Sequence, residues 1–104
     1  MIAATLLLWS ALAVETRTGA IEVPHGRLAY EEAGSGPPLI LLHGITGHAE
    51  AYVRNLRAHA EHFSCWAIDF IGHGYSAKPD HPLEITHYIE QVLGFMDAIG
   101  VEKA

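Results

Sequence analysis

The residues best placed to do chemistry form a short turn at positions 43–47, with the sequence His-Gly-Ile-Thr-Gly. The turn follows an apolar run, Leu39 to Leu42, that reads as a strand buried on both faces. Open α/β sheets bind ligands at the carboxyl ends of such strands. Gly44 and Gly47 would let the backbone approach a ligand closely. The turn therefore predicts a ligand site built from backbone groups, and the alternative is an ordinary strand-to-helix turn.

A second polar motif occupies positions 69–76, with the sequence Asp-Phe-Ile-Gly-His-Gly-Tyr-Ser. It comes at the end of another short apolar run, as the first turn does. Asp69 is expected to accept hydrogen bonds from backbone N–H groups and so to fix a loop punctuated by Gly72 and Gly74. The alternative role for Asp69 is that of a catalytic acid. Ser76 closes the motif.

Other residues that could do chemistry have weaker patterns around them. The Gly-x-Gly at positions 72–74 is not a dinucleotide-binding fingerprint, because Ala77 stands where the third glycine would be. His59 and His62 have a spacing that can bind a metal ion, but a site needs three or four ligands, so a solvated helix face is favoured. Cys65 lies in an apolar run and reads as a buried thiol. No metal and no organic cofactor is predicted.

The elements that must position these motifs alternate between strands and helices. In a helix at 85–99, Thr86 is a plausible N-cap, Gly100 a left-handed stop, and Gly94 a point of close packing. The sequence predicts, in order, strands at 20–23 and 27–32 joined by a turn at 24–26, a strand at 39–42, a helix at 49–62, a strand at 65–70 and the helix at 85–99. The order β-β-β-α-β-α indicates an α/β fold with a mostly parallel, doubly wound sheet.

Length and composition limit what the chain can be. Its 104 residues suggest one domain at most, and with 50% hydrophobic and 17% charged residues it is typical of a globular protein. A formal net charge of −6, without any run of Lys or Arg, argues against a nucleic-acid surface. We therefore expect a folded unit at 20–104, preceded by a separate segment at 1–19.

The amino-terminal segment is apolar but too short to span a bilayer. It resembles a secretory signal, with Ala11 and Ala13 at a small-x-small cleavage site, but no Lys or Arg precedes Arg17. The alternatives are a non-native start or an extra apolar segment that packs on the sheet. We expect a cytoplasmic protein, or an exported one if residues 1–13 are a signal peptide.

Residues 21–104 resemble the amino-terminal half of an α/β-hydrolase, and the best matching stretches are 37–47 and 66–79. In that family the loop after the first of these strands donates one of two backbone N–H groups of the oxyanion hole. The resemblance implies that the N–H of Ile45 is this donor and that Gly44 is the hinge of its loop. It assigns structural roles in the loops to His43, Gly47, Asp69, Gly72, Gly74 and Ser76.

The same resemblance places the remaining catalytic groups outside this sequence. The family's nucleophile sits in a Gly-x-Ser-x-Gly elbow after the next strand, and its acid and then its His follow. Ser76 is not in that frame, and neither are Ser10, Ser35 or Ser64. By this order His43 is not the catalytic base. We expect a fragment truncated before the nucleophile strand and inactive alone, whose full-length parent hydrolyses an ester or a carbon–carbon bond of a small molecule with a nucleophile–His–acid triad.

Within the family, the chain resembles hydrolases with a helical cap, which include carbon–carbon bond hydrolases, epoxide hydrolases, haloalkane dehalogenases and simple esterases. Residues 45–48 match none of these classes closely, so the substrate class stays open. A short binding or partner module, or a degenerate hydrolase-like product, are the alternatives. An apolar sheet edge at 39–42 or 65–70 would also promote self-association.

Overall fold

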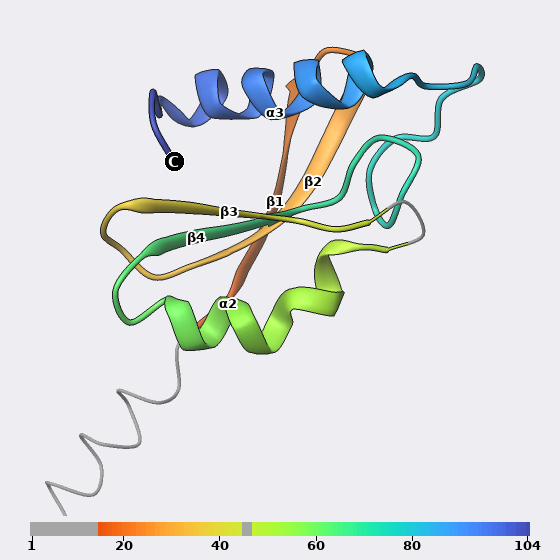
Figure 1. The fold of residues 1–104 in the computed structure, drawn as a ribbon. Coiled ribbons are helices and arrows are strands. Elements are labelled where there is room, and N and C mark those ends of the chain that lie inside the picture. Colours follow the sequence, from red (N-terminus) through yellow and green to blue (C-terminus); the bar gives the residue numbers. More distant parts are fainter. Residues whose placement is uncertain (1–14, 45–46) are drawn as a thin grey trace, which may run out of the picture.

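In this computed structural model, residues 15–44 and 47–104 are described, so the apolar segment at 1–14 lies outside the described residues. The described part is a four-stranded sheet with helices on its two faces (Figure 1). The strand order is β1-β2-β4-β3. The elements are β1 (Arg17–Val23), β2 (Gly26–Ala33), β3 (Pro38–Leu42), the 3₁₀ turn η1 (Ala49–Tyr52), α2 (Val53–His59), β4 (Ser64–Ile68) and α3 (Ile85–Ile99).

The first two strands form the predicted hairpin. Val23 pairs with Gly26, so Pro24 and His25 make a two-residue turn. The backbone of His25 has a φ of 80°, in the left-handed region that non-glycine residues seldom adopt. Pro24 suits the position before it because its ring fixes φ near the value that such a turn needs. β1 begins at Arg17, earlier than the expected strand start at Ala20.

The parallel character of the sheet is confined to one pair of described strands. β3 and β4 are parallel, with η1 and α2 forming the crossover between them. β2 pairs with β1 and with β4 in antiparallel fashion, because the chain enters the sheet through a hairpin. The sheet is therefore mixed, and it matches the amino-terminal part of the α/β fold expected from the sequence. β3 is at its edge.

Each helix covers one face of the sheet and closes its own core (Figure 1). Leu56 of α2 is fully buried with Ala33 and Cys65, whereas Phe95 of α3 is fully buried with Leu28 and other residues on the opposite face. Burying side chains of this size contributes about 1.5–3 kcal/mol for each large residue. The two cores therefore lie on opposite faces of the sheet.

The first helix is shorter than the sequence predicts. It starts as a 3₁₀ turn and its α-helical part ends at His59, so the predicted helix at 49–62 was too long at its carboxyl end. His59 and His62 are therefore not a pair on one helix face, and both side chains are exposed. Among the described residues there is no cluster of three or more side chains that could hold a metal ion.

The second helix begins and ends with recognisable caps. Glu84 is the N-cap, rather than Thr86 as predicted, and it exchanges hydrogen bonds with His87 in a capping box. Gly100 ends the helix with a φ of 74°, as predicted. Close packing at Gly94 is confirmed, since a Cβ there would lie 2.6 Å from a ring carbon of Pro24. No helix in the described ranges is long and apolar enough to cross a bilayer.

Candidate functional site

His43 follows β3 directly and ties the end of that strand to the loop after β4. The residue is 7% exposed, and its Nε2 accepts a hydrogen bond from the Phe70 N–H at 3.1 Å. A backbone N–H can only donate, so the proton of the neutral ring is on Nδ1, which is 2.6 Å from the Gly44 carbonyl oxygen. Both ring nitrogens are thus engaged. This arrangement suits a residue that positions two loops rather than a proton acceptor.

The glycine turn after His43 is closed by a backbone hydrogen bond. The Gly47 N–H donates to the Gly44 carbonyl at 2.9 Å. A Cβ on Gly44 would meet no atom within 4 Å, so this glycine borders open space. Ile45, the predicted oxyanion donor, lies outside the described residues together with Thr46. The structure thus describes the two ends of this loop, and the role of Ile45 stays a prediction.

Asp69 anchors the other end of the same loop. Its side chain is buried, Oδ1 accepts the Ala49 N–H at 2.6 Å, and Oδ2 accepts the Tyr75 N–H at 3.0 Å. A carboxylate that accepts backbone N–H groups forms charge-assisted hydrogen bonds, which are stronger than neutral ones. Because Ala49 begins η1, this side chain joins the segment after the glycine turn to the loop after β4.

Because Gly74 has no side chain, the Asp69 carboxylate can occupy the space beside it. A Cβ on Gly74 would lie 2.3 Å from the carboxylate carbon, and its φ of 50° is in the left-handed region. Gly72 has a φ of 91°, and its N–H donates to the Ala77 carbonyl at 2.8 Å. The two glycines let the loop curl around the carboxylate.

Ser76 joins the same loop to β2. Its hydroxyl donates to the Asp69 carbonyl and accepts the Ala29 N–H at 2.7 Å, with the residue 4% exposed. Lys78 adds two bonds from Nζ, at 2.7 Å each, to the carbonyls of Gly74 and Ser76. A hydroxyl held on both sides in this way is not free to attack a substrate. Burial raises the pKa of the Cys65 thiol, which disfavours a thiolate nucleophile there as well.

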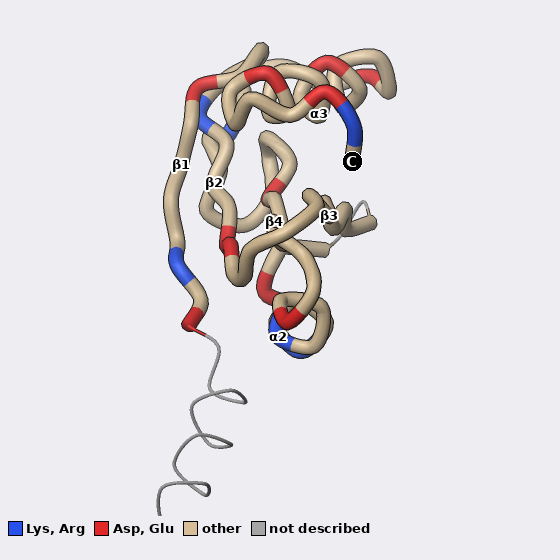
Figure 2. Tube along the Cα trace, turned by 90° about the vertical axis from the view of Figure 1, so that its left-hand side faces the viewer, with Lys and Arg blue, Asp and Glu red and all other residues tan. Residues whose placement is uncertain are grey.

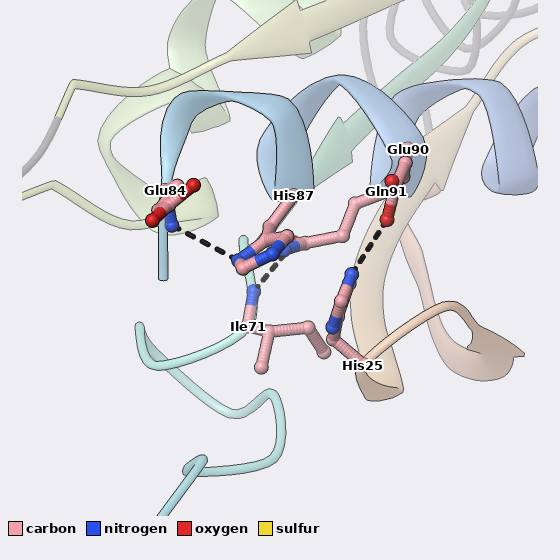
Figure 3. Close-up of polar contacts among 6 residues, drawn as sticks. All are labelled: His25, Ile71, Glu84, His87, Glu90 and Gln91. Atoms are coloured by element: carbon pink, nitrogen blue, oxygen red, sulfur yellow. Dashed lines mark hydrogen bonds and ion pairs between the residues drawn. The ribbon is translucent and has the colours of Figure 1, made fainter. Parts of the chain in front are cut away.

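Gln91 is a site-supporting residue that the sequence reasoning missed. It lies fully buried on α3, and its Oε1 accepts the Ile71 N–H at 2.9 Å (Figure 3). A polar amide on the buried side of an amphipathic helix was the available signal, because buried polar side chains are kept for their hydrogen bonds. On the same helix, Glu90 Oε2 lies 2.7 Å from His25 Nε2, which attaches α3 to the β1–β2 turn (Figure 3).

Several hollows adjoin these loops. An apolar one of about 230 Å³ lies between the end of β3 and the start of α3, and it is lined by His43, Gly44, Phe70, His73, Ile85 and Tyr88. A larger cleft of about 490 Å³ lies beside β1 and β2 and includes the carboxylates of Glu31, Glu50 and Asp69. Burial raises the pKa of Glu31, and the negative charges of Glu50 and Asp69 raise it further. The apolar hollow is lined by His43 and Gly44 at the start of the glycine turn.

The part of the chain that holds both loops is similar to known proteins. The family model described as the alpha/beta hydrolase fold matches residues 37–104, which include both loops. The chain belongs to the α/β-hydrolase family. Its likeness extends over more than this range, because a haloalkane dehalogenase of Mesorhizobium japonicum is 32% identical over 92 residues, which cover 86% of this chain and 29% of that protein.

Other α/β-hydrolases give the same result. Haloalkane dehalogenase 2 of Mycobacterium tuberculosis is 30% identical over 79 residues, covering 75% of this chain and 28% of its own length. The structure of an epoxide hydrolase from an endophytic Streptomyces superposes with a TM-score of 0.81 at 28% identity, and covers 86% of this chain and 28% of that one. The chain thus spans less than a third of these hydrolases, and it matches the amino-terminal part of their fold.

Proposed function

We propose that this chain supplies one wall of the active site of a hydrolase that acts on a small molecule. The observation that carries the proposal is that two hydrogen bonds, one buried and one partly buried, bracket residues 45 and 46. Before them, the His43 ring accepts the Phe70 N–H, and after them, Asp69 accepts the Ala49 N–H. These bonds fix both ends of the loop at the carboxyl ends of two parallel strands, where open α/β sheets bind ligands.

In this proposal the Ile45 N–H stabilises the negative oxygen that develops when the substrate's acyl carbon is attacked. A preorganised backbone donor in such a place is worth about 3–4 kcal/mol of transition-state stabilisation. Gly44 serves as the hinge, since the space beside it is open. The nucleophile, the acid and the catalytic base come from outside these 104 residues, because no serine here stands in a Gly-x-Ser-x-Gly frame.

The substrate class that we propose is a small organic molecule with an apolar portion. The apolar hollow beside Gly44, with Phe70 and Tyr88 in its lining, suits such a group. The related proteins named above are a dehalogenase of haloalkanes and a hydrolase of epoxides. Hydrolysis of an ester or of a carbon–carbon bond fits the same loop chemistry. In either case the proton transfers belong to groups that other parts of the protein supply.

A chimera tests the role of Ile45. The matching segment of the M. japonicum haloalkane dehalogenase is replaced by residues 37–104 of this chain, and dehalogenase kcat is measured. Ile45→Pro removes the N–H and is expected to lower kcat about 100- to 1,000-fold. Ile45→Ala keeps the N–H and is the matched control, with kcat expected to stay within a few-fold. Equal losses in both variants would contradict the proposal.

The isolated chain tests the other half of the proposal. Purified 104-residue protein is expected to hydrolyse an aryl ester, an epoxide and a haloalkane no faster than buffer does. Turnover by the isolated chain that disappears in the Ile45→Pro variant would show that a nucleophile lies within these residues, and would overturn the assignment of the nucleophile to another part of the protein.

A further inference from the structure

The imidazole ring of His25 fastens the β1–β2 turn to α3. Its backbone has a φ of 80°, a conformation that glycine adopts without strain, so the ring is kept there at a cost. The ring reaches across to α3, where Nε2 lies 2.7 Å from Oε2 of Glu90 (Figure 3). Nε2 donates to this carboxylate, and it can do so whether the ring is neutral or charged.

His87 has the opposite requirement. Its Nδ1 accepts the Glu84 N–H at 3.0 Å, and the Glu84 carboxylate accepts the His87 N–H in return (Figure 3). A backbone N–H can only donate, so Nδ1 holds no proton and the ring is neutral. The capping box at the start of α3 therefore exists only while His87 is uncharged.

The two rings lie against each other. Their centroids are 4.4 Å apart, and their planes are tilted by 42°. Imidazole is the side chain whose charge ordinarily changes between about pH 5 and pH 8. We propose that His25 and His87 form a proton-sensitive latch, which holds the first turn of α3 at neutral pH and releases it when His87 gains a proton.

Three effects oppose a proton on His87 while the latch is closed. A proton on Nδ1 replaces the acceptor of the Glu84 N–H by a second donor. The positive charge lies in the first turn of a helix, where the macrodipole disfavours cations. It also lies beside the ring of His25, which can carry a positive charge of its own next to Glu90. All three effects are relieved when the His87 ring turns out of the capping box.

The charges on α3 do not cancel these effects. The helix contains neither Lys nor Arg, and its permanently charged residues are acidic (Figure 2). Glu90 is engaged by His25, and the Glu84 carboxylate by the His87 N–H. Glu84 can pair with a charged His87 only after the ring has turned away from the Glu84 N–H, so that attraction favours the released state.

Among the described residues, the other charged groups near the turn face elsewhere. Glu22 and Arg27 pair in register at the base of the turn, and Glu22 is followed by Val23, which packs on the α3 side of the sheet. Glu22 and Arg27 are therefore on the opposite face, where Arg27 donates to the Tyr75 carbonyl. Lys78 donates to two carbonyls of its own loop.

The turn that the latch holds forms one wall of the apolar hollow. Ile85 and Tyr88 belong to this turn, and they line the hollow together with Phe70. The rings of Tyr88 and Phe70 meet edge to face, with centroids 5.2 Å apart. Release of the turn loosens this wall, so the hollow responds to pH whichever ligand it takes. The latch is a property of these elements and does not require the proposed function.

Amide exchange of the 104-residue chain at about pH 7.5 and about pH 5, corrected for the intrinsic effect of pH, measures the latch. Protection of the Glu84 and His87 amides is expected to fall roughly tenfold at the lower pH, relative to amides of the last turn of α3. His87→Gln supplies an acceptor that takes no proton, and glutamine suits this position of a capping box. Its protection is expected to be equal at both pH values. A fall of the same size in His87→Gln, or no fall in the unmodified chain, would overturn the proposal.

Two further variants separate the latch from a neighbouring histidine. His25→Asn suits a left-handed turn but removes the second charge, and the fall is expected to shrink to a few-fold. His81 lies in the loop before α3, with its Nδ1 2.9 Å from a carboxylate oxygen of Asp80, and His81→Gln is the matched control. There the roughly tenfold fall is expected to remain. An unchanged fall in His25→Asn, or a smaller one in His81→Gln, contradicts a latch made by His25 and His87.

A titration followed by NMR identifies the histidine that acts. The Glu84 amide resonance and the His87 ring resonances are expected to shift with one common midpoint. Two other histidines lie on the hollow side of α3: His43, which accepts the Phe70 N–H, and His73, whose ring centroid is 6.5 Å from that of Tyr88. A Glu84 amide that follows either of these rings, and not His87, would overturn the proposal.

Discussion

The loop after β4 and the open side of β3 lie at neighbouring places in the fold and differ in how their backbone groups are paired. In the loop, the N–H groups of Phe70, Ile71 and Tyr75 each donate to a side chain from another part of the chain or from the loop itself. On the open side of β3, the N–H groups of Ile40 and Leu42 point away from the described sheet. The three loop N–H groups thus have partners within the described residues, whereas those of Ile40 and Leu42 face no other described strand.

The difference shows which parts of an α/β-hydrolase are organised by its amino-terminal residues. Buried side chains hold the loop, and leaving a buried N–H unpaired costs about 1–3 kcal/mol. By contrast, the exposed large apolar side chains of Leu42, Ile89 and Leu93 are not held by any such hydrogen bond. The site loops are thus expected to form before the rest of the fold is added.

Removing the Asp69 carboxylate is expected to destabilise the loop after β4 more than any other change. Asp69→Ala leaves the Ala49 and Tyr75 N–H groups without their acceptor, and is expected to lower the free energy of unfolding by about 3–5 kcal/mol. Asp69→Asn keeps one acceptor oxygen and should lose about half as much. Urea denaturation followed by circular dichroism measures both variants. A loss under 1 kcal/mol in Asp69→Ala would mean that the loop is held by other contacts.

A methyl group at Gly74 breaks the same loop by steric conflict. Gly74→Ala places a Cβ against the Asp69 carboxylate at a residue whose φ is 50°, and is expected to cost about 2–3 kcal/mol. Gly100→Ala is the matched control, because its φ is 74° but its Cβ would meet no atom within 4 Å. About 1 kcal/mol is expected there. Thermal melting of the two variants gives the difference, and equal costs would show that backbone strain alone decides.

The hydrogen bond from the Ile71 N–H to Gln91 is expected to contribute less to the stability of the loop. Gln91→Leu keeps the side-chain volume but orphans the Ile71 N–H, with an expected loss of about 1–2 kcal/mol. Gln91→Glu keeps an acceptor and serves as the comparison variant. The Ile71 amide should lose exchange protection in Gln91→Leu only. Unchanged protection in that variant would remove Gln91 from the network.

Neutralising Glu31 is expected to have the smallest effect on stability, and this effect should be stabilising. Because its pKa is raised above the ordinary 4.5 in the folded chain, ionisation of Glu31 opposes folding, and the penalty grows as the pH rises from 4.5 to the raised value. Glu31→Gln is therefore expected to raise the melting temperature slightly at pH 7. The gain should vanish below pH 4.5, where both states hold the proton. A gain that is the same at both pH values would point to packing rather than charge.

Much of the fold could be predicted because it depends on local patterns. The apolar run at Leu39 to Leu42, the hairpin turn at His25 and the stop at Gly100 each follow from residue types close in sequence. Two errors have local causes as well. Glu84 took the capping role predicted for Thr86, because His87 completes a capping box with it. The first helix was predicted to be too long, because the apolar periodicity of the sequence continues past His59, where the helix ends.

The site was harder to predict because its partners are distant in sequence. Asp69 reads as a loop-fixing carboxylate, but nothing near it indicates that Ala49 supplies one of its N–H partners. The link from Gln91 to Ile71 spans a loop and a helix turn, and only the fold brings the two together. His43 is held by the Phe70 N–H, which lies in the loop after β4 and is remote from His43 in sequence.

Amide exchange of the dilute chain is the most direct test of the central claim that these residues organise the site loops by themselves. The Ala49, Phe70 and Tyr75 amides are expected to exchange as slowly as amides inside the sheet, while those of Ile40 and Leu42 exchange fast. Fast exchange at Ala49, Phe70 and Tyr75 in a chain whose sheet amides are protected would contradict the account, because the loops would then depend on protein outside these 104 residues.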